Sequence, residues 1–249
     1  MRELISCWQH TRMIVLIALC AALYVAVLLP FKIATIVPGI TEVRPAAALP
    51  IFFSIFFGPV AAWGTAFGNL IGDVLGGTIG PGSIPGFFGN ILYGFVPYRV
   101  LKAYLGSRDG LRTRKGWAVF AFAVVLASAV CAVLIATGVD LIGIPFGFLV
   151  HTIFLNNLLV SLLLAPLLIG TLGKRIREMK LTYEQILPAQ EISNANKIGP
   201  LIVLVLTLIL YALMLVPAFR ETFPFLVDNK SVFQILACVL LFIATLILI

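Results

Sequence analysis

A few polar side chains interrupt the long apolar stretches of this sequence, and their types suit solute recognition. Polar groups inside a membrane are costly and usually face the protein interior, where they mark the path of a solute or an ion. Asn69 and Asp73 are four residues apart and therefore share one face of a helix. The residues predicted to bind a solute are Glu42, Arg44, Asn69, Asp73, Asn90, Tyr93, His151, Asn156 and Asn157.

The depth expected for these residues predicts a single pocket. Counting about 1.5 Å per residue from the ends of the expected helices places Asp73, Asn90 and His151 in the outer half of the membrane. Asn69 and Asn156 lie nearer the middle by the same count. Polar groups from separate helices therefore meet at similar depth, which predicts a pocket that opens outward. Alternatively, the asparagines only hydrogen-bond across helix contacts and hold the bundle together.

Two connections between helices could close this pocket. Residues 31–45 are too polar to span a membrane and too apolar for a solvated loop, so we expect them to lie over the outer mouth. Their Glu42 and Arg44 would recognise the solute, or else form an ion pair exposed to water. Residues 76–86 contain five glycines and two prolines, which predicts an irregular cap whose backbone can approach a ligand closely.

The sequence carries no familiar catalytic motif. No lysine follows the glycines of residues 76–86, so they do not form a phosphate-binding loop, and neither H-E-x-x-H nor G-x-S-x-G occurs. The four cysteines show neither metal-ligand spacing nor a disulfide framework. His151 is as consistent with a structural hydrogen bond as with a ligand contact. We therefore expect no catalytic residue, no metal and no cofactor.

The composition identifies the surroundings that must position these residues. Apolar residues make up 61% of the 249 and charged residues only 11%, with a mean hydropathy of +1.13, far from the balance of a soluble domain. A bilayer core about 30 Å thick needs roughly 20 apolar residues per helix, and backbone groups in lipid must be satisfied within the segment. The prediction is an all-α, polytopic membrane protein without strands. The expected spans are residues 13–29, 46–57, 60–75, 87–104, 117–139, 146–172, 198–216 and 231–249.

The distribution of basic residues predicts the orientation. Eight spans put both termini on one side, and the termini and loops of that side hold 13 of the 17 Lys and Arg residues. The other side holds only Lys32, Arg44, Arg220 and Lys230. The positive-inside rule then places both termini in the cytoplasm of a multi-pass protein of the cell membrane. The net charge of +7 reflects this topology, so no nucleic-acid partner is expected.

The chain divides into three parts. Residues 1–172 hold six closely spaced helices and form the predicted substrate-binding core. Residues 173–197 are the longest polar stretch and form a predicted cytoplasmic linker. Residues 198–249 form an appended transmembrane hairpin with few polar side chains, which we expect to be peripheral and to face lipid.

Several short motifs in the core resemble one family of membrane proteins. They are Val43-Arg44-Pro45, Leu49-Pro50, Phe57-Gly58-Pro59 and Gly68-Asn69-Leu70-Ile71-Gly72-Asp73. Together with six compact helices and a long outer segment, they are similar to the S components of energy-coupling factor (ECF) transporters, over residues 10–175. The resemblance implies high-affinity capture of a vitamin or other micronutrient. It also implies as partners a transmembrane T component and two ATPases, which drive release inward.

The first span carries a possible docking face for such a partner. Ala18, Ala22 and Ala26 recur every four residues, like the alanine face with which S components dock on their T component. Small side chains at this spacing let another helix pack closely. The appended hairpin departs from the six-helix pattern of the family.

Two other functions remain open at this point. One is a membrane-embedded enzyme or accessory factor of lipid or isoprenoid metabolism, and the other is a secondary transporter that works alone, with Asp73 coupling uptake to an ion gradient. The sequence does not identify the solute, although the amides and charges suit a polar compound and the nearby aromatic residues suit a ring.

Overall fold

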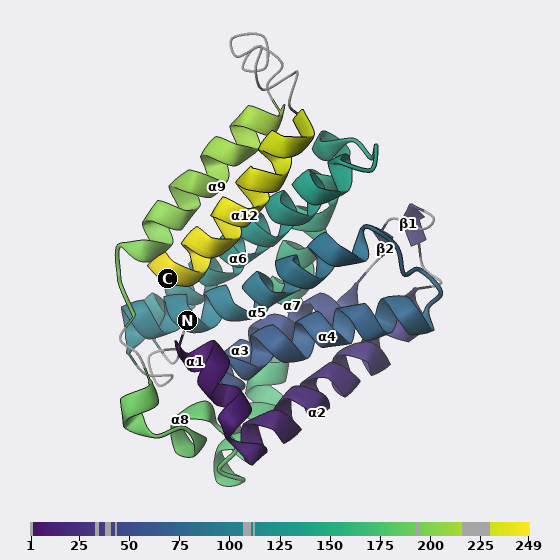
Figure 1. The fold of residues 1–249 in the computed structure, drawn as a ribbon. Coiled ribbons are helices and arrows are strands. Elements are labelled where there is room, and N and C mark those ends of the chain that lie inside the picture. The colour runs from purple at the N-terminus through teal and green to yellow at the C-terminus, as the bar shows by residue number, and fades with distance from the viewer. Residues whose placement is uncertain are drawn as a thin grey trace.

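The computed structural model describes residues 2–32, 35–37, 41–42, 44–106, 111, 113–192, 195–215 and 230–249. The predicted all-α fold is confirmed, and each expected span coincides with a helix (Figure 1). These helices are α2 (Thr11–Leu28), α3 (Ala48–Phe57), α4 (Val60–Leu75), α5 (Ser83–Leu105), α6 (Arg114–Asp140), α7 (Phe146–Glu178), α9 (Gly199–Leu215) and α12 (Lys230–Leu248). The short helical segments are α1 (Arg2–Ser6), η1 (Cys7–Gln9), η2 (Leu29–Phe31), η3 (Pro45–Ala47), α8 (Tyr183–Ile186) and η5 (Ala189–Glu191).

The structure differs locally from the sequence-based expectation. A short antiparallel pair, β1 (Thr35–Val37) with β2 (Thr41–Glu42), was not expected, but its threonines and valine favour strands. Helix α7 continues to Glu178, past the expected end at residue 172, and basic residues in its last turn suit the negative end of the helix dipole. Helix α5 begins at Ser83, so residues 83–86 of the expected irregular cap are helical.

Lengths and hydropathy identify a multi-pass membrane protein. Two shorter apolar helical stretches accompany four that are long and apolar enough to cross a bilayer. The long stretches are Thr11–Phe31, Arg114–Asp140, Phe146–Ile186 and Ser231–Leu248, and the shorter ones are Pro45–Phe57 and Gly199–Leu215. All ten residues of α3 are buried, so this short helix lies inside the bundle and does not face lipid.

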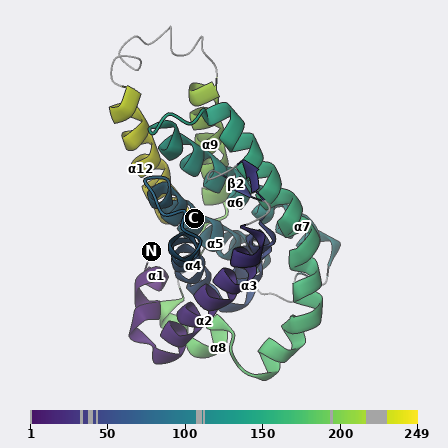
Figure 2. The same cartoon turned by 90° about the vertical axis from the view of Figure 1, so that its right-hand side faces the viewer.

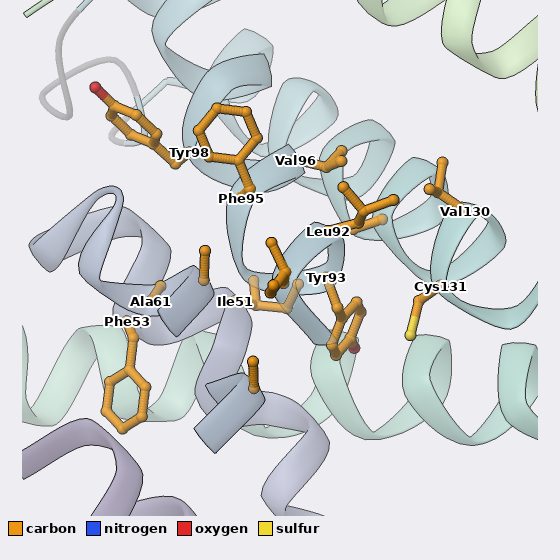
Figure 3. Close-up of a cluster of buried hydrophobic side chains, with 14 of the residues drawn as sticks. Ile51, Phe53, Ala61, Leu92, Tyr93, Phe95, Val96, Tyr98, Val130 and Cys131 are labelled. Atoms are coloured by element: carbon orange, nitrogen blue, oxygen red, sulfur yellow. The ribbon is translucent and has the colours of Figure 1, made fainter. Parts of the chain in front are cut away.

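Helix α5 forms the centre of the bundle, between α4 and α6 (Figures 1 and 2). Helix α2 packs on the other side of α4, while α7 packs against both α3 and α6 and follows one edge of the molecule in Figure 2. Figure 3 shows the core where these helices meet, with Leu92 of α5 facing Val130 of α6 and Tyr93 near Cys131. The core therefore surrounds α5 along much of its length.

Glycines allow two very close helix contacts in this core. A Cβ atom placed on Gly68 of α4 would lie 2.7 Å from the Cβ of Tyr24 on α2. A Cβ atom on Gly94 of α5 would lie 2.6 Å from the carbonyl oxygen of Ala61 in α4. Such distances are too short for any side chain, so small residues set the separation of α2, α4 and α5.

The appended hairpin of α9 and α12 lies beside α6 (Figure 1). Gln234 on α12 donates a hydrogen bond to the Asp140 carboxylate at the end of α6. Many apolar side chains on the outer faces of both helices are exposed.

Both ends of the chain come together at the end of α5 that lies away from β1 and β2 (Figure 1). We call this the terminal end. Glu3 is completely buried there and accepts hydrogen bonds from Arg99 at 3.0 Å, Lys102 at 3.0 Å and Tyr98 at 2.8 Å. Arg99 also donates from Nε to the carbonyl oxygen of Ile249 at 2.7 Å. The terminal end is thus closed by a buried ion-pair network that involves both ends of the chain.

Candidate solute-binding site

A cavity of about 240 Å³ lies at the opposite end of α5 from the buried Glu3 network. Its walls come from α2, α4, α5, α6 and α7, together with residues of the connections between these helices. The cavity brings together seven of the nine predicted solute-binding residues. They are Arg44, Asn69, Asp73, Asn90, Tyr93, Asn156 and Asn157.

Asp73 is the centre of a polar cluster on the cavity wall. The whole residue is only 8% exposed, and its Oδ1 atom lies 3.0 Å from the ammonium of Lys32. Ser83, at the start of α5, donates a hydrogen bond to its Oδ2 atom at 2.9 Å, and Thr78 contacts Oδ1 at 3.5 Å. Asn69 contacts Oδ2 at 3.5 Å from one helical turn earlier. A buried carboxylate needs a cation and hydrogen-bond donors, and this cluster supplies both.

Arg44 brings a second positive charge to the cavity. Its Nη1 atom donates to the amide oxygen of Asn69 at 3.3 Å, and its backbone N–H donates to the amide oxygen of Asn156 at 3.4 Å. The same Asn69 side chain contacts both Arg44 and Asp73, so one amide connects the cation to the carboxylate. Guanidinium groups bind planar acceptors well, and Arg44 could hold a carbonyl or carboxylate of a solute.

Tyr93 and Asn90 form part of the inner wall. The Tyr93 hydroxyl lies 2.7 Å from the Ser161 hydroxyl and donates to the carbonyl oxygen of Asn157 at 3.2 Å. The Asn90 side chain donates from Nδ2 to the carbonyl oxygen of Gly86 at 2.8 Å. These bonds fix the orientation of the side chains, and cavities with a few fixed polar groups are typical of small-molecule sites.

His151 does not belong to the cavity, which corrects the prediction of one pocket for all nine residues. Its side chain is exposed and contacts the Tyr211 hydroxyl on α9 at 2.9 Å. Asn156 is five residues further along α7, which rotates it by about 140° around the helix axis. The two side chains therefore point to different sides of α7. The Glu42 side chain lies outside the described part of the structure.

Sequence reasoning missed Lys32, Thr78 and Ser83. The sequence shows Lys32 only as one of four basic residues on the less basic side. Its position just after the first span, on the same side as Asp73 in the last turn of α4, was the available signal for a pair. The bond of Ser83 to Asp73 depends on where α5 begins, and the sequence placed that start four residues too late.

The alanine face of α2 lies outside the cavity. Ala18, Ala22 and Ala26 are exposed and line an open apolar groove with Phe67 and Ile71 of α4. The opposite face of α2 packs on the glycines of α4, so this helix has one face inside the bundle and one outside.

The polar groups that line the cavity are suited to binding a solute. It offers one carboxylate, two cations, several amides and the Tyr93 ring. Within the residues that the structure describes, no three His, Cys, Asp or Glu side chains are grouped so that they could hold a metal ion. The cavity can therefore recognise a small polar solute by complementary hydrogen bonds and charge.

Comparison with known proteins identifies a transporter family. A family model described as "QueT transporter" matches residues 14–174, which is more than half of the chain. The match covers every residue of the cavity and ends before the appended hairpin. No curated protein and no solved structure matches the chain.

Proposed function

Because the chain belongs to the QueT transporter family, a family of queuosine precursor transporters, we propose that its cavity captures such a precursor for uptake. The observation that carries the proposal is the convergence of seven predicted polar residues on one cavity within the matched segment. Transporter sites commonly lie within the membrane bundle, where polar side chains are otherwise costly.

The size and polarity of the cavity fit this kind of solute. A volume of about 240 Å³ lies just below the usual range for drug-sized ligands, so the cavity suits a compact molecule. Queuosine is a nucleoside with a modified guanine-like base, and such a base presents donors and acceptors along the edge of a flat ring. The amides of Asn69, Asn90 and Asn156 and the guanidinium of Arg44 offer matching partners, and Tyr93 offers an aromatic face.

Binding to the purified protein tests this proposal. A queuosine precursor should bind in isothermal titration calorimetry, and Asn90→Ala should weaken binding by about 1–3 kcal/mol, the usual loss for a buried hydrogen-bonding group. His151→Ala is the matched control, because this polar residue lies at similar depth outside the cavity, and it should leave the affinity unchanged. Equal losses in both variants, or no binding by the wild type, would reject the proposed site.

The finer proposal is that the chain is an ECF S component that works with a T component and two ATPases. The sequence has no phosphate-binding loop, so energy for accumulation would come from other subunits. The groove lined by Ala18, Ala22 and Ala26 would receive a helix of the T component, because small side chains permit close approach. The charge distribution supports an orientation with both termini in the cytoplasm.

Capture and transport should then be separable by one substitution. Ala22→Leu adds bulk in the groove and should abolish uptake in cells that contain the partner subunits, while the affinity of the purified variant stays near that of the wild type. Gly170→Leu is the control, because this exposed position of α7 has open space around it and lies away from the groove. Normal uptake by Ala22→Leu would reject the docking face. Uptake into vesicles that contain this chain alone would favour a secondary transporter.

A further inference from the structure

Asp73 joins three segments of the chain at one edge of the cavity. Lys32 comes from the segment after α2, Thr78 from the connection between α4 and α5, and Ser83 from the first turn of α5. All three side chains line the cavity together with Asp73. The carboxylate is therefore a wall group of the cavity as well as the point at which these segments meet.

Lys32 reaches Asp73 with an extended side chain. Its aliphatic part passes directly over Gly76, where any larger residue would clash with it. The side chains of Lys32 and Asp73 are only 9% and 11% exposed, so the pair is largely withdrawn from water. An unpaired carboxylate at this position would be strongly unfavourable.

The two buried carboxylates among the residues that the structure describes, Glu3 and Asp73, are neutralised in different ways. Glu3 is bonded to Arg99, Lys102 and Tyr98, and this site is packed at the terminal end. Within the described residues, Asp73 has a single ion-pair partner, which is a lysine beside an open cavity. A lysine ammonium is a point charge on a flexible stem, so a solute with a similar group can take its place without leaving the carboxylate unpaired.

We propose that the ammonium of Lys32 pairs with Asp73 while the cavity is empty, and that an ammonium or amino group of the solute replaces it on Asp73 during binding. This inference rests on the proposed function, and it adds that the precursor carries such a group at the end that enters next to Asp73. Lys32 then opposes binding by competition, whereas Asp73 determines specificity for donor-bearing solutes.

The first experiment tests whether Asp73 accepts a small cation from the cavity. Lys32→Ala should lower the thermal stability of the purified protein, and methylammonium chloride should restore much of the lost stability. Sodium chloride at equal ionic strength should not. The double variant Lys32→Ala/Asp73→Asn is the control, because it has no carboxylate to neutralise and should show no specific response to methylammonium. Equal responses to both salts would overturn the proposal.

The second experiment tests competition by Lys32 on the solute itself. The dissociation constants of an amine-bearing queuosine precursor and of a neutral analogue of the same ring are measured by calorimetry. Lys32→Met should bind the amine at least threefold more tightly than the wild type does, with little change for the analogue. Asp73→Asn keeps a polar side chain of equal size, and it should reduce the preference for the amine to near unity. A preference that survives in Asp73→Asn would overturn the proposal.

The two experiments distinguish failure of this inference from failure of the proposed function. If methylammonium stabilises Lys32→Ala but the wild type binds no queuosine precursor, the proposed solute is wrong and the role of Asp73 stands. If precursors bind the wild type but methylammonium has no specific effect, the cavity holds the solute and the replacement of Lys32 is rejected.

Discussion

Replacing Glu3 with alanine should destabilise the protein more than almost any other single loss of charge. The side chain is completely buried and accepts hydrogen bonds from Arg99, Lys102 and Tyr98, so its removal leaves the buried Arg99 and the partly buried Lys102 without their common anion. Breaking a buried ion pair by removing one partner costs about 3–5 kcal/mol. At roughly 2–4 °C per kcal/mol, the melting temperature should fall by about 6–20 °C.

The assay is thermal unfolding of the purified protein in detergent, followed by intrinsic fluorescence. Glu178→Ala is the matched control, since Glu178 also faces a lysine, Lys174, at 3.8 Å, but both side chains are mostly exposed. Exposed pairs one helical turn apart contribute only about 0.3–0.5 kcal/mol, so this variant should melt within about 2 °C of the wild type.

A third variant separates charge from hydrogen bonding. Glu3→Gln keeps one acceptor oxygen and nearly the same volume, so it should lose less stability than Glu3→Ala but more than Glu178→Ala. If Glu3→Ala and Glu178→Ala melt at the same temperature, the network contributes nothing measurable and the reasoning from burial is refuted.

Two further predictions concern packing and reactivity. Gly94→Ala should lower the free energy of unfolding by about 1–3 kcal/mol in chemical denaturation, because the new Cβ would lie 2.6 Å from a backbone oxygen. The control Gly170→Ala, which has open space around it in α7, should instead stabilise the protein by about 0.5–1 kcal/mol. Equal effects of the two substitutions would contradict the close contact at Gly94. Burial raises the pKa of the Cys7 thiol to about 12, so at pH 8 the thiol stays protonated in the folded protein and should resist maleimide. After unfolding in a denaturing detergent, the pKa of this thiol returns to the ordinary range and maleimide should label it. Labelling of native Cys7 at the rate of the denatured chain would show that the thiol is accessible.

The approximate positions of the helices that match the eight expected spans followed from the sequence alone. Long apolar runs must be helical in lipid because each backbone group needs a partner within its own segment, and this local requirement depends little on the neighbours. The same periodicity put Asn69 and Asp73 on one face of α4, as the structure shows. Depth could also be counted along each helix, which brought seven of nine predicted residues to one cavity.

Rotation of each helix about its axis was decided only by tertiary packing. His151 has the right depth but faces α9, because the contacts of α7 with α3 and α6 determine which side of this helix meets the cavity. Lys32 and Asp73 are 41 residues apart, and Glu3 and Arg99 are 96 apart. Pairs at such separations depend on how α2, α4 and α5 approach one another through glycine contacts. A sequence shows that such charges need partners, but only the packed bundle determines which partner each one meets.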